Sequence, residues 1–372
     1  MVPQSISDGM VFDQIDKGIN FLRLTKFLNY INLLLQIRHS HLGALLLKRI
    51  LLSLTITAII LFVLLSQISL KDLVTLLKSV DPIWAALGIT GYILALLFRA
   101  LRFKWLIHSK DVPLLELFRV TVFHNLSIMV LPSKLGEFIF PYFLNKISGI
   151  SITEGLASLI ASRVYDFFII LTTFLFASIG FQNLFKINPF LIILLTALLL
   201  VFIFFAFSHM SGLLIGFSSV LGKVSKWRGH KNIKSFLWVQ RKMNEIAEDF
   251  YAIKARRAYL PVSLTSFISW VMVFWMCYAF LRGFGIDISF LRVVFGSAVG
   301  MMASALPISG LGNWGTMEVG WTAGFLMAGL NKGKAIASGF GVHILVFITC
   351  VVISFICWGT SKKIKPFSHL TK

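Results

Sequence analysis

The amino-acid sequence predicts an all-α, polytopic integral membrane protein. Of its 372 residues, 57% are apolar and only 13% are charged, and 36 are phenylalanine; the mean hydropathy is +0.86. Soluble domains average about 45–50% apolar and about 25% charged residues, so this composition excludes a water-soluble enzyme. Several apolar stretches are also as long as the ~20 residues that a helix needs to cross a bilayer.

Six of these stretches are predicted to cross the membrane fully. They are 50–68, 83–101, 155–179, 190–207, 260–281 and 335–358. They belong to one transmembrane domain, residues 49–360, preceded by residues 1–48, whose apolar residues recur at roughly helical spacing. That spacing predicts an amphipathic helix on the membrane surface, or else a mobile cytoplasmic tail. Residues 361–372 are predicted to form a basic cytoplasmic tail.

Two further apolar regions are broken by Pro and Gly. In the first, 117–131 and 136–147 flank the break, and in the second 290–306 and 315–330 do. At ~1.5 Å per residue the first two arms measure about 17–23 Å, which is short of a ~30 Å hydrocarbon core. We therefore predict helical hairpins that enter and leave on one side; the alternative is that each arm is a short tilted span. The predicted hairpin tips contain Pro132, Gly136, Pro307, Gly310 and Gly312.

The basic residues predict the orientation. With both termini on the same side, 27 of the 35 Lys and Arg residues fall on the side of the termini and seven on the other, which leaves Arg163 alone inside a span. The positive-inside rule then places the termini and the basic segment 208–259 in the cytoplasm, as for a protein of the plasma membrane. We interpret this segment as interfacial and expect it to contact anionic lipid of the cytoplasmic leaflet, which accounts for the net charge of +20 without nucleic acid.

The order of span, broken hairpin with an acidic residue, and span occurs twice. The first copy carries Leu131-Pro132-Ser133 and Glu137, and the second carries Leu306-Pro307-Ile308-Ser309 and Glu318. Threading the chain through the membrane gives the two copies opposite orientations. An inverted repeat whose broken helices meet near the middle of the bilayer is the pattern of alternating-access transporters.

Ionisable residues inside the membrane are the candidate functional residues, because each costs roughly 2.5–3.5 kcal/mol to insert. Arg163 and Asp166 lie three residues apart on one helical face. They form either a self-neutralised pair or a site in which Asp166 orients Arg163 toward an anionic headgroup. Glu137 and Glu318 each follow a predicted tip. They either cap helix N-termini or bind a coupling proton or the cationic part of a substrate.

Several other polar residues allow two interpretations each. His124 and Asn125 could hydrogen-bond a sugar or phosphate, although a satisfied core histidine is the commoner case, and the same holds for His343. Arg99 and Arg102 are interpreted as interface residues that extend toward water, with headgroup contact as the alternative.

Motifs for catalysis are missing from the sequence. It contains no His-Glu-x-x-His, no Gly-x-Ser-x-Gly and no nucleotide-binding loop. The three cysteines stand apart from one another and from histidines, so we expect packing residues and neither a disulfide framework nor a zinc site. We therefore predict no catalytic residues, no metal and no cofactor.

Three motifs together resemble the lysylphosphatidylglycerol synthase transmembrane family, also called flippase-like. They are Asn125 to Glu137, the run Ser162-Arg163-Val164-Tyr165-Asp166, and Leu306 through Trp314-Gly315 to Glu318. The resemblance covers about residues 50–359 and implies that Arg163, Asp166, Glu137 and Glu318 carry the function. Basic residues that many members have near the two glutamates are replaced here by Phe138-Ile139-Phe140 and Met317. We expect a stand-alone member without the soluble aminoacyl-transferase domain.

The leading functional hypothesis is a translocase that moves an anionic or glycan-linked lipid, a phospholipid or a polyprenyl-phosphate glycolipid, between leaflets. One alternative is a membrane-embedded transferase or hydrolase that acts on a lipid headgroup. The other is an accessory subunit that binds a membrane glycosyltransferase or synthase through its basic cytoplasmic segment.

Overall fold

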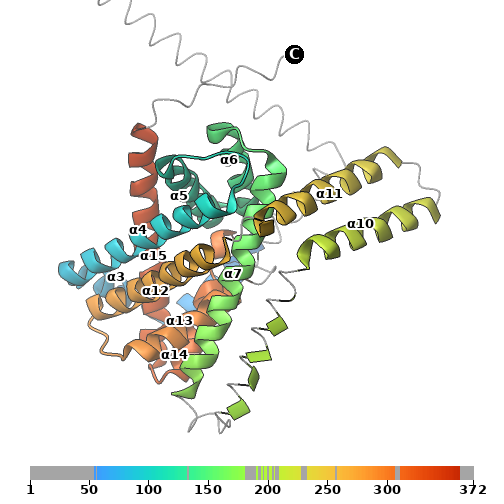
Figure 1. The fold of residues 1–372 in the computed structure, drawn as a ribbon. Helices are drawn as coiled ribbons and strands as arrows, with labels where there is room; N and C mark the ends of the chain where they lie inside the picture. The colour runs from blue at the N-terminus through green and yellow to red at the C-terminus, as the bar shows by residue number, and fades with distance from the viewer. Residues whose placement is uncertain are drawn as a thin grey trace, which may run out of the picture. The chain divides into compact units, whose positions relative to one another are not determined.

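The computed structural model describes residues 54–55, 57–131, 134–180, short pieces between 190 and 205, and residues 209–227, 233–255, 258–305 and 311–360. All elements named below belong to one compact unit, Ile56–Lys372. The described residues form helices and contain no β-strand, so the predicted all-α class is confirmed for them (Figure 1). The predictions for residues 1–48 and 361–372 concern segments outside the described residues.

Four helices are long and apolar enough to cross a membrane. They are α4 (Pro82–Leu106), α7 (Ile152–Ile179), α12 (Tyr259–Gly283) and α15 (Lys332–Gly359). They confirm four of the six predicted spans. Of the other two, 50–68 is described only at 54–55 and 57–68, and 190–207 only in short pieces; neither is among the four candidate spans, and both stay predictions.

Side-chain caps define where three of these helices begin. Asp81 accepts hydrogen bonds from the backbone N–H groups of the first turn of α4, and Pro82 occupies the position where no N–H is needed. Ser151 caps α7 and Asn331 caps α15 in the same way. The polar residues that precede the apolar runs therefore set the helix starts.

Each of the two predicted hairpins has two α-helices and a short 3-10 helix between them, and we call the connecting stretches, 131–138 and 306–315, the first and the second break. The elements are α5 (Leu114–Val130), η1 (Leu135–Phe138) and α6 (Ile139–Ser148), then α13 (Phe290–Ala305), η2 (Leu311–Asn313) and α14 (Thr316–Met327). Helix α5, with 17 residues, is about 26 Å long and shorter than the bilayer core. Of the predicted tip residues, Pro132, Pro307 and Gly310 lie outside the described residues. Re-entry from one side, and the inverted relation of the two copies, remain predictions.

The two breaks meet at the C-terminal end of α5. The Gly136 Cα lies so close to the backbone of Ser127 and Ile128 that a Cβ there would come within 2.6 Å of it. Gly312 donates its N–H to the Leu131 carbonyl at 3.4 Å and abuts the carbonyl of Met129. Only residues without a side chain fit at these two contacts, which explains the glycines that the sequence places in the tips.

The core is built on the pair α4 and α12, which pack along their length (Figure 1). Leu96 of α4 and Cys277 and Phe280 of α12 are fully buried between them. The three cysteines are free and buried, as expected of packing residues. Packing of this apolar core fixes where the charged residues of α4 and α7 lie.

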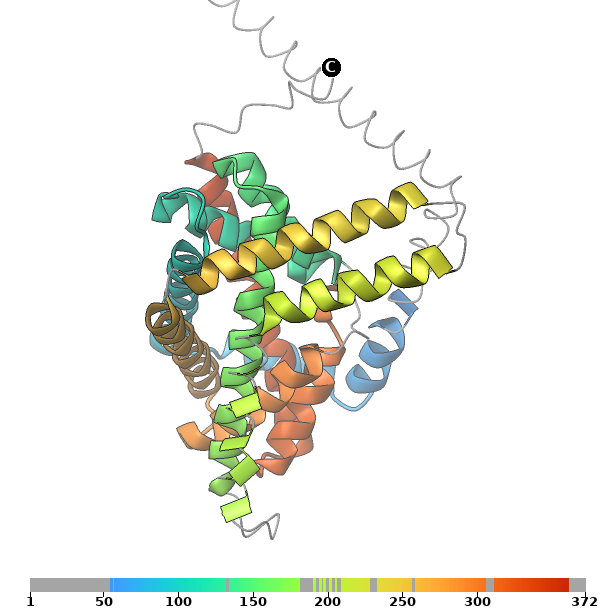
Figure 2. The ribbon, with the colours of Figure 1, turned by 45° about the vertical axis from the view of Figure 1, so that its right-hand side comes forward.

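The basic segment 208–259 forms two helices, α10 (Met210–Trp227) and α11 (Ile233–Ala255). They lie side by side, and α11 also packs against α7 (Figure 2). Ala247, Phe250 and Ile253 of α11 are buried in this contact, whereas Leu237 and Trp238 near its start are exposed. The segment is therefore a helical hairpin attached to the core at one end.

Candidate functional site: an electropositive cavity

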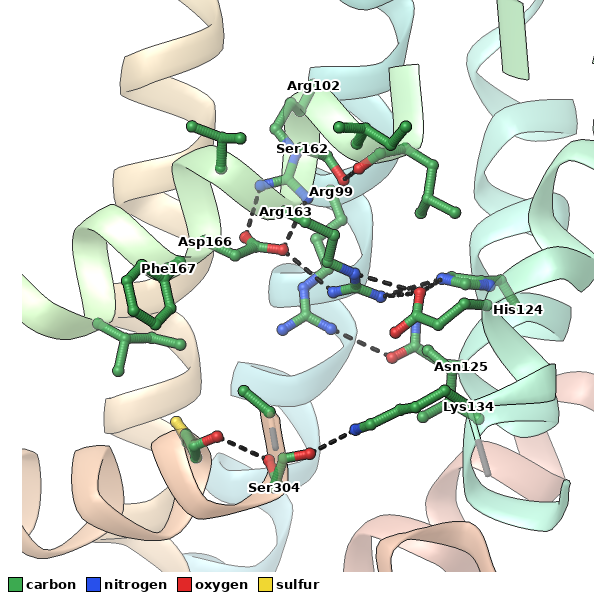
Figure 3. A pocket seen from close by; sticks show the side chains of 18 of the residues that line it. Arg99, Arg102, His124, Asn125, Lys134, Ser162, Arg163, Asp166, Phe167 and Ser304 are labelled. Carbon is green, nitrogen blue, oxygen red and sulfur yellow. Dashed lines mark hydrogen bonds and ion pairs between the residues drawn. The ribbon is translucent and has the colours of Figure 1, made fainter. Parts of the chain in front are cut away.

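A cavity of about 1030 Å³ lies among α4, α5, α7, α12 and α13 and is bordered by both breaks. Figure 3 shows that charged side chains from several of these elements point toward one another in it. The polar residues that line it include Arg99, Arg102, His124, Asn125, Lys134, Glu137, Arg163, Asp166 and Asn313. The chain thus places four cations and two carboxylates around one space.

Asp166 is the buried centre of the charged cluster. Arg102 donates to both of its carboxylate oxygens, at 2.6 and 3.3 Å, and the two side chains are 2% and 7% exposed. The Trp270 indole donates to the same carboxylate at 2.8 Å, and Arg163 donates at 3.2 Å. A carboxylate with this many donors has its charge fully compensated at depth.

Arg163 connects α7 to the first break. Its Nη2 and Nε atoms donate to Glu137 Oε2 at 2.7 and 3.2 Å, and Nη2 lies 3.2 Å from His124 Nε2. Since it also binds Asp166, its guanidinium is largely engaged by the protein itself. Glu137 is therefore an ion-pair partner of Arg163.

Among the arginines that line the cavity, Arg99 is the one without a carboxylate partner in the described chain. Its Nη1 donates to Asn125 Oδ1 at 3.1 Å, and its guanidinium lies 5.6 Å from the centre of the Trp270 ring. Asn125 is held in turn by its own bond to the Thr121 carbonyl. Among the described residues no carboxylate lies within ion-pair distance of Arg99, and its buried Nε has no hydrogen-bond partner.

Lys134 brings a fourth cation to the cavity from the first break. Its ammonium contacts the Ser304 carbonyl and, at 3.2 Å, Asn313 Oδ1. Both acceptors are uncharged, and Asn313 belongs to the second break. Lys134 therefore carries a charge that its observed partners in the described chain do not neutralise.

The cavity has a surplus of positive charge and an apolar, exposed wall. Arg99, Arg102, Arg163 and Lys134 exceed the two carboxylates by two charges when His124 is neutral. A site lined by one sign of charge with low-dielectric walls attracts the opposite ion. The apolar residues Phe138, Ile160, Phe167 and Phe202 line the same cavity, yet each is more than a third exposed. The geometry thus suits a ligand with an anionic and an apolar part.

The predicted candidate residues fall into two places. Arg163, Asp166, Glu137, His124 and Asn125 line the cavity together. Glu318 does not: its carboxylate accepts from the Gly315 N–H at 2.6 Å and contacts His343, so its predicted capping role is confirmed. Gly136 and Gly312 lie at the breaks, as described above.

Two interpretations of the arginines are wrong. Arg102 was interpreted as extending toward water, but it is 2% exposed and paired with Asp166. Arg163 was expected to be the only basic residue inside a span, but α4 continues to Leu106 and carries Arg99 and Arg102 within the helix bundle. Arg99 and Arg102 are three residues apart and therefore lie on one helical face. This spacing is the sequence feature that could have indicated a shared site.

These features define the class of the protein: a helical, multi-pass membrane protein with an electropositive cavity. The family model for the lysylphosphatidylglycerol synthase TM region matches residues 50–354. The match covers most of the chain, so the protein belongs to this family, as its motifs indicated, and a lipid-related function in the membrane follows. Among curated proteins, none matches this chain.

Proposed function

We propose that the protein is a lipid translocase that moves an anionic lipid between the leaflets of the plasma membrane. The observation that carries the proposal is the combination of surplus positive charge and exposed apolar residues in one cavity. A soluble anion needs only the charge, whereas a phospholipid or a polyprenyl-phosphate glycolipid needs both. The cavity volume lies at the upper end of the ~300–1,000 Å³ of pockets for small ligands, which leaves room for a headgroup larger than phosphate.

Arg99 and Lys134 are the residues that we assign to the phosphate. Their observed partners are neutral side chains and a carbonyl, so an incoming phosphate gives each of them its first anionic partner. The planar guanidinium of Arg99 matches two phosphate oxygens at once. Arg102 and Arg163 already bind carboxylates and instead hold the cluster in place.

The enzyme alternative receives less support from this geometry. A general base needs a carboxylate that is free to accept a proton. Glu137 and Asp166 are both engaged by arginines at 2.7 Å or less, so neither carboxylate is free for this role. The accessory-subunit alternative would use the exposed face of α11, and no contact within the described chain favours it over translocation.

Movement between leaflets requires that the cavity open alternately to the two sides. The contact of Lys134 with Asn313 joins the two breaks directly, and this contact would have to open during transport.

The orientation of the protein in the membrane is tested by placing single cysteines at Leu237, which is exposed on α11, and at Lys332, at the start of α15. In intact cells an impermeant thiol reagent should label the second and not the first; the reverse pattern would invert the orientation.

Translocation is tested with purified protein in liposomes by following the protection of a fluorescent anionic lipid from an external quencher. The wild type should move this lipid faster than a zwitterionic one. Arg99→Gln should slow the anionic lipid about 10- to 100-fold, because a hydrogen bond to a charged group contributes about 1.5–3 kcal/mol. Lys104→Gln, a change on the same helix outside the cavity lining, is the control and should not. Equal rates for Arg99→Gln and the wild type would remove Arg99 from the binding site.

A further inference from the structure

A second pair of ionisable side chains lies buried outside the cavity lining. His343 Nδ1 of α15 is 2.5 Å from Glu318 Oε1 of α14, and the two side chains are 4% and 0% exposed. The other carboxylate oxygen accepts the Gly315 N–H at 2.6 Å. The imidazole is covered by the Trp314 indole, with ring centres 4.0 Å apart and planes inclined by 10°. The proposed lipid site does not use this pair.

The described side chains of the helices packed around the pair offer it no other ion-pair partner. Helix α14 packs against α13 and α15, and α15 packs also against α3, α4, α5 and α12. The charged residues described on these elements are Lys71, Lys78, Arg99, Arg102, Lys104, Glu116, Arg119, His124, Arg282, Arg292, Lys332 and Lys334. Within the described chain, none of them is within ion-pair distance of Glu318 or His343, whose ion-pair contact is with each other.

Binding or release of one proton therefore changes the net charge of this buried pair. Imidazolium and carboxylate together are neutral, whereas neutral imidazole and carboxylate carry one negative charge. An uncompensated charge at 0–4% exposure is strongly disfavoured. Release of the proton thus requires either that water reach the site or that a cation approach it.

Three consecutive residues connect this pair to the cavity. Asn313 accepts a hydrogen bond from Lys134, Trp314 stacks on His343, and Gly315 donates to Glu318. Asn313 and Gly315 both have positive φ, 64° and 88°, a conformation that costs energy for asparagine unless contacts maintain it. If Lys134 moves to a bound phosphate, Asn313 loses that contact, so binding in the cavity changes the charge beside the second break and is felt next to the pair.

We propose that Glu318 and His343 form a proton-binding site and that a proton binds there cooperatively with the anionic headgroup in the cavity. The proposal rests on the translocase function given above. In the structure the positive charge of Lys134 lies at Asn313, beside the pair, where it favours the deprotonated, negatively charged form. When Lys134 pairs with phosphate instead, that charge is no longer available, and the pair stays neutral only by keeping its proton. Because such coupling is reciprocal, an anionic lipid must raise the proton affinity of the pair and a proton must raise the affinity for the lipid.

Lipid transport driven by a pH gradient tests the coupling between proton and lipid. In liposomes with a difference of one pH unit, co-transport of one proton with each singly charged lipid should enrich that lipid about tenfold in one leaflet. Glu318→Gln and His343→Gln should lose this enrichment and leave equal leaflets. Glu154→Gln is the matched control, since Glu154 is also a buried carboxylate that accepts backbone N–H groups, from His108 and Ser109, and it should keep the enrichment.

Trp314 provides a readout that does not depend on transport. Protonated imidazole quenches a stacked indole, so the fluorescence of the wild type minus that of Trp314→Phe should titrate with pH. The midpoint should rise when the liposomes contain anionic instead of zwitterionic lipid, and Glu318→Gln should abolish that rise. A wild type that translocates lipid but shows neither enrichment nor a lipid-dependent midpoint would overturn the proton site and leave the translocase intact. A wild type that moves no lipid under any gradient would overturn the translocase itself.

Discussion

The charged cluster of the cavity and the Glu318–His343 pair both stabilise a buried carboxylate, but they do so with different cations. Both place a carboxylate deep among helices beside one of the two breaks. Asp166 has two arginines and an indole around it, whereas Glu318 has one imidazole and one backbone N–H. The first cluster borders a cavity with surplus positive charge, and the second is closed to solvent.

The difference follows from what each cation can do. An arginine stays protonated at every physiological pH, so a buried one needs a permanent anionic partner. A histidine exchanges its proton near neutral pH and can lose its charge when its partner changes. The arginine cluster is therefore suited to hold a fixed field for an anion, and the Glu–His pair is suited to respond to protons.

The largest expected effect is on stability, and it should distinguish the arginine cluster from the Glu318–His343 pair. Asp166→Leu should lower the free energy of unfolding by about 3–5 kcal/mol, because Arg102 stays charged at 2% exposure without its carboxylate. His343→Leu should cost less, because Glu318 can take up a proton and become neutral. Thermal unfolding of both variants in the same detergent measures the two losses.

A double variant sharpens this comparison. Arg102→Met combined with Asp166→Leu removes the buried cation together with its partner, so stability should recover most of the loss seen in Asp166→Leu. A double variant as unstable as the single one would show that packing around Asp166, and not the unpaired charge, dominates.

The next effect concerns the breaks that lie beside both sites. Gly136→Ala places a methyl group within 2.6 Å of the α5 backbone at Ser127 and Ile128, and overpacking of this kind costs about 1–3 kcal/mol. Gly216→Ala on α10 is the control, since nothing lies within 4 Å of its added Cβ. It should stabilise the protein by up to about 1 kcal/mol through helix propensity. Equal melting temperatures for the two variants would contradict the close contact at the first break.

The smallest effect comes from another carboxylate–imidazole contact, outside the spans. Asp249 of α11 lies 3.1 Å from His108 Nε2, and burial raises the pKa of Asp249 above its ordinary value of 3.8. A raised folded-state pKa means that stability falls as the pH rises from 3.8 through the raised value. Asp249→Asn should remove that fall, with a change of no more than about 1 kcal/mol, as measured by melting temperature against pH. A wild type whose stability rises over this range would contradict the sign.

The span helices and the polar residues inside them could be predicted from sequence. Apolar length alone identified α4, α7, α12 and α15, because a bilayer demands ~20 apolar residues. The glycines at positions 136 and 312 marked the two breaks, and the three-residue spacing of Arg163 and Asp166 predicted their contact. These features depend on residues that are near one another in the chain, or on the solvent that each segment meets.

Only the tertiary structure decided which charges meet across the chain. Arg102 and Asp166 are 64 residues apart, Lys134 and Asn313 are 179 apart, and neither helical period nor composition encodes such pairings. The structure also separated Glu318 from the cavity and paired it with His343. The physical reason is that a charge in the membrane must find a partner wherever packing of the apolar helices brings one, and that packing is set by the whole bundle.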